Sequence, residues 1–195
     1  MFSVETNLRV LIVEDSTDDA ALLVRELEQN GFKLSSERVD TAAAMLSALK
    51  NKRWDIILSD YIIPEFGGIE ALKIAQQSDR DLPFIVVSGK VGEEMLVEAM
   101  KAGASDFVLK DRLGRLSAAV KRELTDAAAR RGIRRAEIEW RTAFDSVRDP
   151  IFFHDTEYRI LRANLAYAEH AHMAIKDVIG KYYCCLLYTS DAADE

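Results

Sequence analysis

The sequence predicts an α/β protein whose larger part is a five-stranded, doubly wound parallel sheet. Short segments rich in Val, Ile and Leu alternate with amphipathic segments of helical period along roughly the first 130 residues. The short segments are apolar almost throughout, which is typical of parallel strands that are covered on both faces. From Asp111 onward the pattern changes to one long helical run. We therefore expect a linker helix and then a smaller α+β unit.

The expected strands and helices alternate strictly. The strands are residues 8–13, 34–39, 55–59, 83–88 and 105–110. The helices between them are residues 18–30, 41–51, 67–77 and 93–103. Gly31 and Gly103 stand at the ends of the first and last of these helices, where glycine is a usual stop.

The long helical run has two parts with different expected roles. Its first part has apolar residues spaced by three or four, which predicts packing against the sheet as the last helix; they are Leu113, Leu116, Val120, Leu124 and Ala128. The second part resumes this spacing after Gly132, with Ile133, Ala136, Trp140 and Phe144. This narrow stripe suits a homodimer through the linker helix, but a single solvated helix explains it equally well.

The C-terminal region predicts the beginning of a second fold. Residues 151–154 and 158–162 are expected to be strands, and a helix is expected from about Asn164. Residues 185–195, CLLYTSDAADE, resemble the translation of a sequencing-library adapter, so we expect them to be read-through and exclude them from the fold. The chain would then be a fragment of a longer gene.

Composition narrows the classes of function. A formal net charge of −7 argues against binding nucleic acid, because phosphate recognition needs a basic surface. No stretch approaches the length of apolar sequence that a membrane span needs, so no membrane segment is expected in this fragment. Cys184 and Cys185 are adjacent, which suits neither a disulfide framework nor a spaced metal site, and a cytoplasmic location is expected.

Polar residues end four of the five predicted strands. Glu14 and Asp15 follow the first strand, Asp60 the third, Ser88 the fourth and Lys110 the fifth. Parallel strands place their carboxyl ends at one edge of the sheet, where ligands bind. Carboxylates that meet there repel one another unless a hard cation such as Mg²⁺ lies between them. A lysine and a hydroxyl beside them suit a phosphoryl group, and an aspartate can accept one as an aspartyl phosphate.

Four motifs in this order resemble the receiver domain of bacterial two-component response regulators. They are VLIVEDS, DIILSDYIIPEFGGIEAL, PFIVVSGKVGEE and AGASDFVLKDRL, within about residues 7–130. The resemblance implies a flavodoxin-like sheet of strand order 2-1-3-4-5. It also implies that Asp60 is the phosphoacceptor and that a histidine kinase or phosphotransfer protein supplies the phosphoryl group.

The resemblance also implies roles for the surrounding residues. Glu14 and Asp15 would form the acidic pocket, and Mg²⁺ would be held by Asp15, Asp60 and the backbone carbonyl of Ile62. The chain has Glu14 where the family usually has a first aspartate.

The phosphoryl-binding and switch residues implied by the resemblance are Ser88, Lys110 and Phe107. Phe107 lacks the hydroxyl of the commoner tyrosine. Most members have a proline after the lysine, joined by a cis peptide bond, whereas this chain has Asp111. A cis bond before a non-proline residue costs about 2.5–4 kcal/mol, so we expect a trans Lys110–Asp111 peptide and an altered loop.

The region after the long helix resembles the first part of a PAS sensory domain, including Asn164 at the start of a helix and Gly180. The expected division is a receiver domain at 1–130, a linker helix at 131–147, a PAS fragment at 148–184 and adapter read-through at 185–195. The full gene could continue as a histidine kinase or as a cyclic-dinucleotide enzyme.

Phosphorelay signal transduction is the leading functional hypothesis, with two alternatives. A Mg²⁺-dependent phosphohydrolase with an aspartate nucleophile usually carries a second acid two residues later, where this chain has Ile62. A pseudo-receiver that only docks or dimerises would not need the acids together with Ser88 and Lys110.

Overall fold

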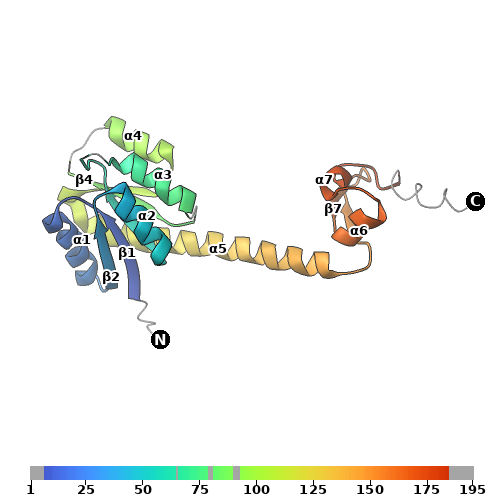
Figure 1. Cartoon of the computed structure of the whole chain (residues 1–195), viewed down its shortest axis with the longest axis horizontal. Helices are drawn as coiled ribbons and strands as arrows, with labels where there is room; N and C mark the ends of the chain where they lie inside the picture. The colour runs from blue at the N-terminus through green and yellow to red at the C-terminus, as the bar shows by residue number, and fades with distance from the viewer. Residues whose placement is uncertain (1–6, 65, 79–80, 90–92, 185–195) are drawn as a thin grey trace, which may run out of the picture. The chain divides into compact units, whose positions relative to one another are not determined.

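The computed structural model describes residues 7–64, 66–78, 81–89 and 93–184. The chain divides into two compact units, Met1–Arg131 and Gly132–Glu195 (Figure 1). The predicted adapter read-through at 185–195 lies outside the described residues. Among the described helices, none combines the length and apolar character needed to cross a membrane.

The first unit contains a five-stranded parallel sheet in the order β2-β1-β3-β4-β5, which confirms the predicted fold. Its strands are β1 (Asn7–Val13), β2 (Lys33–Val39), β3 (Ile56–Asp60), β4 (Phe84–Ser88) and β5 (Asp106–Leu109). The register pairs Val13 with Ser59, Asp60 with Val87, and Ser88 with Leu109. The carboxyl ends of β1, β3, β4 and β5 therefore lie at one edge of the sheet.

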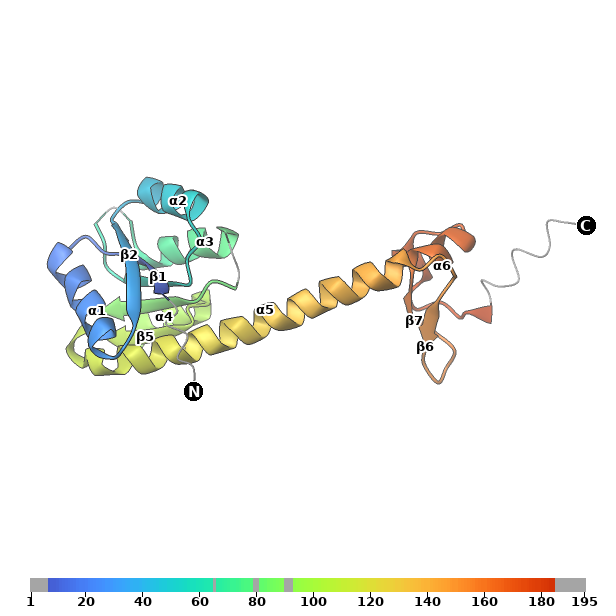
Figure 2. The same cartoon turned by 90° about the horizontal axis from the view of Figure 1, so that it is seen from below.

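Helices cover both faces of this sheet because alternate residues of each strand point to opposite sides. The helices are α1 (Thr17–Gln29), α2 (Ala42–Asn51), α3 (Gly68–Ser78), α4 (Glu93–Ala102) and α5 (Leu116–Ser146). In β1, Leu11 and Val13 lie in the core beneath α2, α3 and α4, whereas Val10 and Ile12 lie in the core beneath α1 and α5. Figure 2 shows α1 and the beginning of α5 together on one side of the sheet.

The segment after β5 differs from the predicted uninterrupted helix. Residues Lys110–Arg115 form a 3₁₀ helix, η1, in which Arg112 has non-helical backbone angles, and α5 begins only at Leu116. The Lys110–Asp111 peptide is trans, as predicted. Leu116 and Val120 are buried as expected, but Ala127 is buried in place of the predicted Ala128. The buried face of α5 differs from the predicted face by one residue. Packing against the sheet, and not the spacing of apolar residues alone, determines which side chains are buried.

The second unit has a small core of its own. An antiparallel pair, β6 (Phe152–His154) and β7 (Ile160–Ala163), precedes α6 (Leu165–His170) and α7 (Ile175–Val178). The second strand begins two residues later than predicted, because Asp155 accepts hydrogen bonds from the backbone N–H groups of Glu157 and Arg159 and so lengthens the turn. Tyr158 has a positive φ of 65° in this turn.

Candidate functional site

Three acidic side chains meet at the carboxyl edge of the sheet. Glu14 and Asp15 follow β1 and Asp60 ends β3, and one carboxylate oxygen from each lies within 4.8 Å of the others. We call these three residues the acid cluster. The pairing of Val13 with Ser59 brings Glu14 and Asp60 side by side, as the sequence pattern predicts.

The acid cluster combines burial with like charge. Glu14 is 1% exposed and Asp60 is 9% exposed. Burial raises the pKa of the Glu14 carboxyl above its ordinary value, although hydrogen bonds from Lys110 and from the Ser16 backbone N–H act in the opposite direction. Crowded carboxylates in this setting favour a hard divalent cation, and an all-oxygen ligand set suits Mg²⁺. The residues present therefore fit the predicted metal.

Lys110 is the cation that faces the acid cluster. Its ammonium donates hydrogen bonds to Glu14 Oε2 at 2.8 Å, to Asp60 Oδ2 at 2.7 Å and to Asp19 Oδ2. Burial alone would lower the pKa of Lys110, but its hydrogen bonds to the three carboxylates outweigh burial and raise it. Lys110 therefore remains charged at neutral pH, beside the predicted phosphoacceptor.

Asp19 is a residue of the site that the sequence analysis missed. It lies in the first turn of α1, and its backbone N–H donates to the capping side chain of Ser16 at 3.2 Å. The sequence offered one signal, the acidic pair Asp18 and Asp19 at the start of the predicted helix at 18–30. That signal is also what an ordinary helix N-terminus shows, so it did not single out Asp19.

The remaining predicted residues take different positions. The Ile62 backbone N–H donates to Asp60 Oδ1 at 3.1 Å, while the Ile62 side chain is exposed. Ser88 is buried at the end of β4, and a methyl group on the next residue, Gly89, would lie 3.8 Å from Lys110 Cδ. Phe107 instead packs against the apolar core beneath α2, α3 and α4. The structure thus groups Glu14, Asp15, Asp60 and Lys110 closely, with Ser88 at the adjacent strand end.

Arg38 holds the backbone that carries two of the acids. Its Nη1 donates to the backbone oxygen of Glu14 at 2.8 Å and of Asp15 at 3.3 Å, and to Asp40 Oδ2 at 3.1 Å. Because β2 pairs with β1, an arginine near the end of β2 can reach this backbone. No local pattern in the sequence indicates this role of Arg38.

Tyr61 connects the loop after Asp60 to α4. Its hydroxyl donates to Glu98 Oε2 at 2.6 Å, and this hydrogen bond raises the pKa of Tyr61 to about 12. The loop that carries the predicted phosphoacceptor is therefore tied to a helix on one face of the sheet. This contact was also absent from the sequence predictions.

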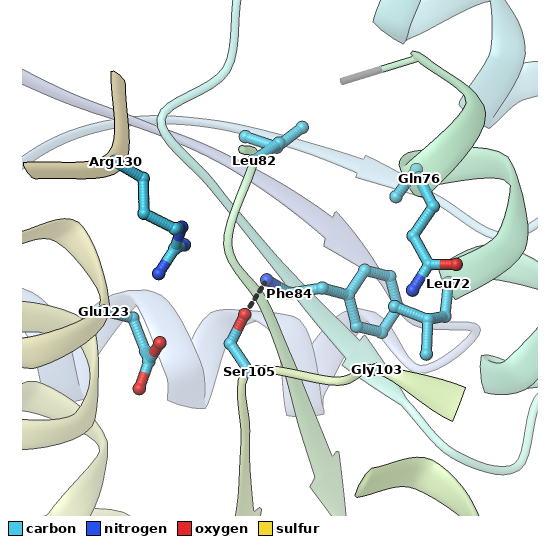
Figure 3. A pocket seen from close by; sticks show the side chains of 9 residues that line it. Leu72, Gln76, Leu82, Phe84, Gly103, Ser105, Glu123 and Arg130 are labelled. Atoms are coloured by element: carbon cyan, nitrogen blue, oxygen red, sulfur yellow. Dashed lines mark hydrogen bonds between the residues drawn. The ribbon is translucent and has the colours of Figure 1, made fainter. Parts of the chain in front are cut away.

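A cavity of about 350 Å³ lies among α3, the beginning of β4, the α4–β5 connection and α5 (Figure 3). Several of its polar groups are already engaged within the protein. Ser105 Oγ accepts from the Phe84 backbone N–H at 3.1 Å, and Gln76 Nε2 donates to the Ala102 carbonyl at 2.9 Å. Glu123 accepts hydrogen bonds from Arg122. These contacts hold the surrounding elements together, so the acid cluster with Lys110 is the stronger candidate for chemistry.

Two known proteins are similar to this chain in sequence. The transcriptional regulatory protein PrrA of Mycobacterium tuberculosis is 33% identical over 129 residues, which cover 64% of this chain and 54% of that protein. The chemotaxis protein CheY of Thermotoga maritima is 33% identical over 102 residues, which cover 52% of this chain and 84% of CheY. The chain thus spans about half the length of PrrA.

A solved structure shows the same fold. The crystal structure of a CheY-like response regulator receiver domain protein from Methanospirillum hungatei matches with a TM-score of 0.56 at 26% identity, covering 64% of this chain and 99% of that chain. The family model of the response regulator receiver domain matches residues 10–121, more than half of the 195 residues. The sheet order, the acid cluster at its carboxyl edge and these matches together show that the chain belongs to the response regulator receiver family.

Proposed function

We propose that this protein is a phosphorelay receiver that accepts a phosphoryl group on Asp60. The observation that carries the proposal is the position of Asp60, which lies within the acid cluster and accepts a hydrogen bond from Lys110 at 2.7 Å. A nucleophilic carboxylate, a metal-binding ligand set and a fixed cation are the groups that phosphoryl transfer needs. Membership of the receiver family supports the same chemistry.

The transfer replaces one bond to phosphorus with another. An oxygen of Asp60 forms a bond to phosphorus while the bond between phosphorus and the donor breaks, and the electron pair of the broken bond leaves with the donor. The donor we propose is the phosphohistidine of a histidine kinase or phosphotransfer protein. The backbone N–H of Ile62 holds Asp60 Oδ1, which orients the carboxylate for attack.

Mg²⁺ is the proposed cofactor, and it would neutralise charge on the phosphoryl oxygens. Glu14, Asp15, Asp60 and the backbone carbonyl of Ile62 are the groups we assign to it. Lys110 and Ser88 would hold the phosphoryl oxygens after transfer, and Phe107 would move with Ser88 as the switch aromatic.

For the second unit, we propose the N-terminal part of a PAS domain at 148–184, preceded by a receiver at 1–130 and a linker helix at 131–147. The β6–β7 pair and the following helices support this proposal. Ile133 and Trp140, two residues of the predicted apolar stripe, are 72% and 40% exposed, which supports pairing of the linker helix with a second copy. Phosphorylation would be relayed through this helix to the PAS or effector region.

The test treats the whole chain with acetyl phosphate and Mg²⁺ and follows its intact mass. We expect the mass of one added phosphoryl group in the wild type and in Asp18→Asn, and none in Asp60→Asn. Asp18 is exposed and serves as the matched control. Chelation of Mg²⁺ should prevent the reaction. No added mass in the wild type would favour a phosphorylation-independent docking module and reject the proposal. Added mass that persists in Asp60→Asn would place the phosphoryl group on another residue and would also reject it.

A further inference from the structure

Lys110 has no spare hydrogen-bond donor in this state of the protein. An ammonium group has three N–H donors, and Lys110 already donates to Glu14, Asp60 and Asp19. Its side chain is only 19% exposed. If Lys110 is to bind a phosphoryl oxygen, at least one of these three carboxylates must give up its hydrogen bond.

Asp19 differs from the other two partners of Lys110. Glu14 and Asp60 belong to the acid cluster, whereas Asp19 is not among the carboxylates grouped within 4.8 Å. Its side chain is 36% exposed, compared with 1% for Glu14 and 12% for Asp60, so water can solvate it once Lys110 leaves. Asp19 is therefore the partner that Lys110 can release at the smallest desolvation cost.

The backbone of Asp19 is held in place. The hydrogen bond from its N–H to Ser16 Oγ caps α1, and Ser16 itself donates from its backbone N–H to Glu14 Oε1 at 3.2 Å. The Asp19 carboxylate is thus presented to Lys110 from a structured helix terminus. Its neighbour Asp18, in the same turn, is exposed, and its side chain makes no hydrogen bond or ion pair within the described part of the chain.

We propose that Asp19 is a positioning residue that restrains Lys110 in the unphosphorylated protein and competes with the incoming phosphoryl group for it. This inference rests on the proposed function and adds a determinant of how readily Asp60 is phosphorylated. The competition is electrostatic, because the Asp19 carboxylate and the phosphoryl oxygens are both anionic and seek the same ammonium. Removing the Asp19 charge should therefore make phosphorylation easier.

The experiment compares Asp19→Asn with Asp18→Asn in the whole chain. Both variants remove one carboxylate from the first turn of α1, so changes in net charge and in the helix dipole interaction are matched. The initial rate of phosphorylation by acetyl phosphate is measured by intact mass, and Mg²⁺ affinity is measured by calorimetry. Because a partly exposed ion pair contributes up to about 1 kcal/mol, Asp19→Asn should be phosphorylated about three- to fivefold faster than Asp18→Asn.

Two further readouts separate positioning from other roles. Mg²⁺ affinity should be the same in Asp19→Asn and Asp18→Asn, since Asp19 lies outside the acid cluster. Asp19→Glu keeps the carboxylate and should restore a rate close to that of the wild type. A merely structural role of Asp19 would not produce a faster reaction that the glutamate reverses.

Three results would overturn the inference while leaving the proposed function intact. They are equal rates in Asp19→Asn and Asp18→Asn, a slower rate in Asp19→Asn, and a loss of Mg²⁺ affinity confined to Asp19→Asn. The slower rate would mean that Asp19 preorganises Lys110 for the reaction, and the lost affinity would mean that Asp19 is part of the metal site. Absence of phosphorylation in the wild type would instead reject the proposed function, and the inference with it.

Discussion

Arg9 binds Asp55 through two guanidinium nitrogens at the amino end of β3. The distances are 3.0 Å from Nε to Oδ2 and 2.7 Å from Nη2 to Oδ1, and the Arg9 backbone N–H also donates to Oδ2. Burial alone would raise the pKa of Asp55, but these hydrogen bonds from Arg9 outweigh it and lower the pKa. The pair joins β1 to β3 at a distance from the acid cluster, so it affects stability rather than chemistry.

Asp55→Asn should lower the free energy of unfolding by about 1 kcal/mol at pH 7, a value limited by the exposure of the Arg9 side chain. The pKa of Asp55 is lower in the folded protein than in the unfolded chain. Its stabilisation is therefore present above the unfolded value of about 4 and is lost as pH falls through the folded pKa. Urea unfolding between pH 7 and pH 3 measures the effect. A difference between wild type and Asp55→Asn that is as large at pH 3 as at pH 7 would contradict this account. Asp18→Asn is the control.

The backbone of the β3–α3 loop limits which side chains can stand next to Asp60. Gly68 begins α3, and a methyl group built there would lie 2.7 Å from the carbonyl oxygen of Asp60 and 2.9 Å from Tyr61 Cα. Both contacts are with backbone atoms, which cannot rotate away as a side chain can. The close approach of α3 to the end of β3 therefore requires glycine at this position.

Gly68→Ala should displace the loop that carries Asp60 and cost about 1–3 kcal/mol, as overpacking of a close contact does. It should also slow phosphorylation of Asp60 by acetyl phosphate, because the carboxylate loses its fixed geometry. Chemical denaturation and intact mass measure the two effects. The matched control is Gly67→Ala, whose added methyl meets no heavy atom within 4 Å. Equal behaviour of the two variants would show that the loop accommodates the methyl group.

At the scale of the whole molecule, the two units have separate cores. The first unit has a core on each face of its sheet, and the second unit is organised around the buried side chain of Asn164. Asn164 Oδ1 accepts from the backbone N–H groups of Ile151 and Tyr167, and its Nδ2 donates to the carbonyls of Val147 and Asp149. One amide thus joins the segment after α5 to the start of β6 and to α6.

Asn164→Ala should destabilise the second unit by about 2–4 kcal/mol, because it leaves several buried backbone groups without their partner. Hydrogen exchange followed by mass spectrometry should show faster exchange in residues 148–184 and unchanged exchange in β1, β3 and β4. Glu169→Ala, on the exposed face of α6, is the control. Loss of protection in the first unit as well would show that the two units do not unfold independently.

Prediction from sequence succeeded where a residue's position follows from its place along a strand. Parallel strands must end at the same edge, so Glu14, Asp60 and Lys110 could be placed together from the sequence. Prediction from sequence failed where a side chain forms a hydrogen bond with a residue of another element. Neither Asp19 in α1 nor Arg38 in β2 carries a local signal of its partner, because each partner depends on how the helix and strand pack.

The sequence by itself determined the alternation of strands and helices, the edge at which the polar strand ends meet, and the trans peptide after Lys110. These follow from hydrophobic pattern and covalent geometry, which are local properties of the chain. Only the tertiary structure decided that Lys110 is shared among three carboxylates, that Tyr61 reaches Glu98, and that α5 begins after a 3₁₀ segment. Those features depend on distances between elements, and packing sets such distances only when the whole sheet is assembled.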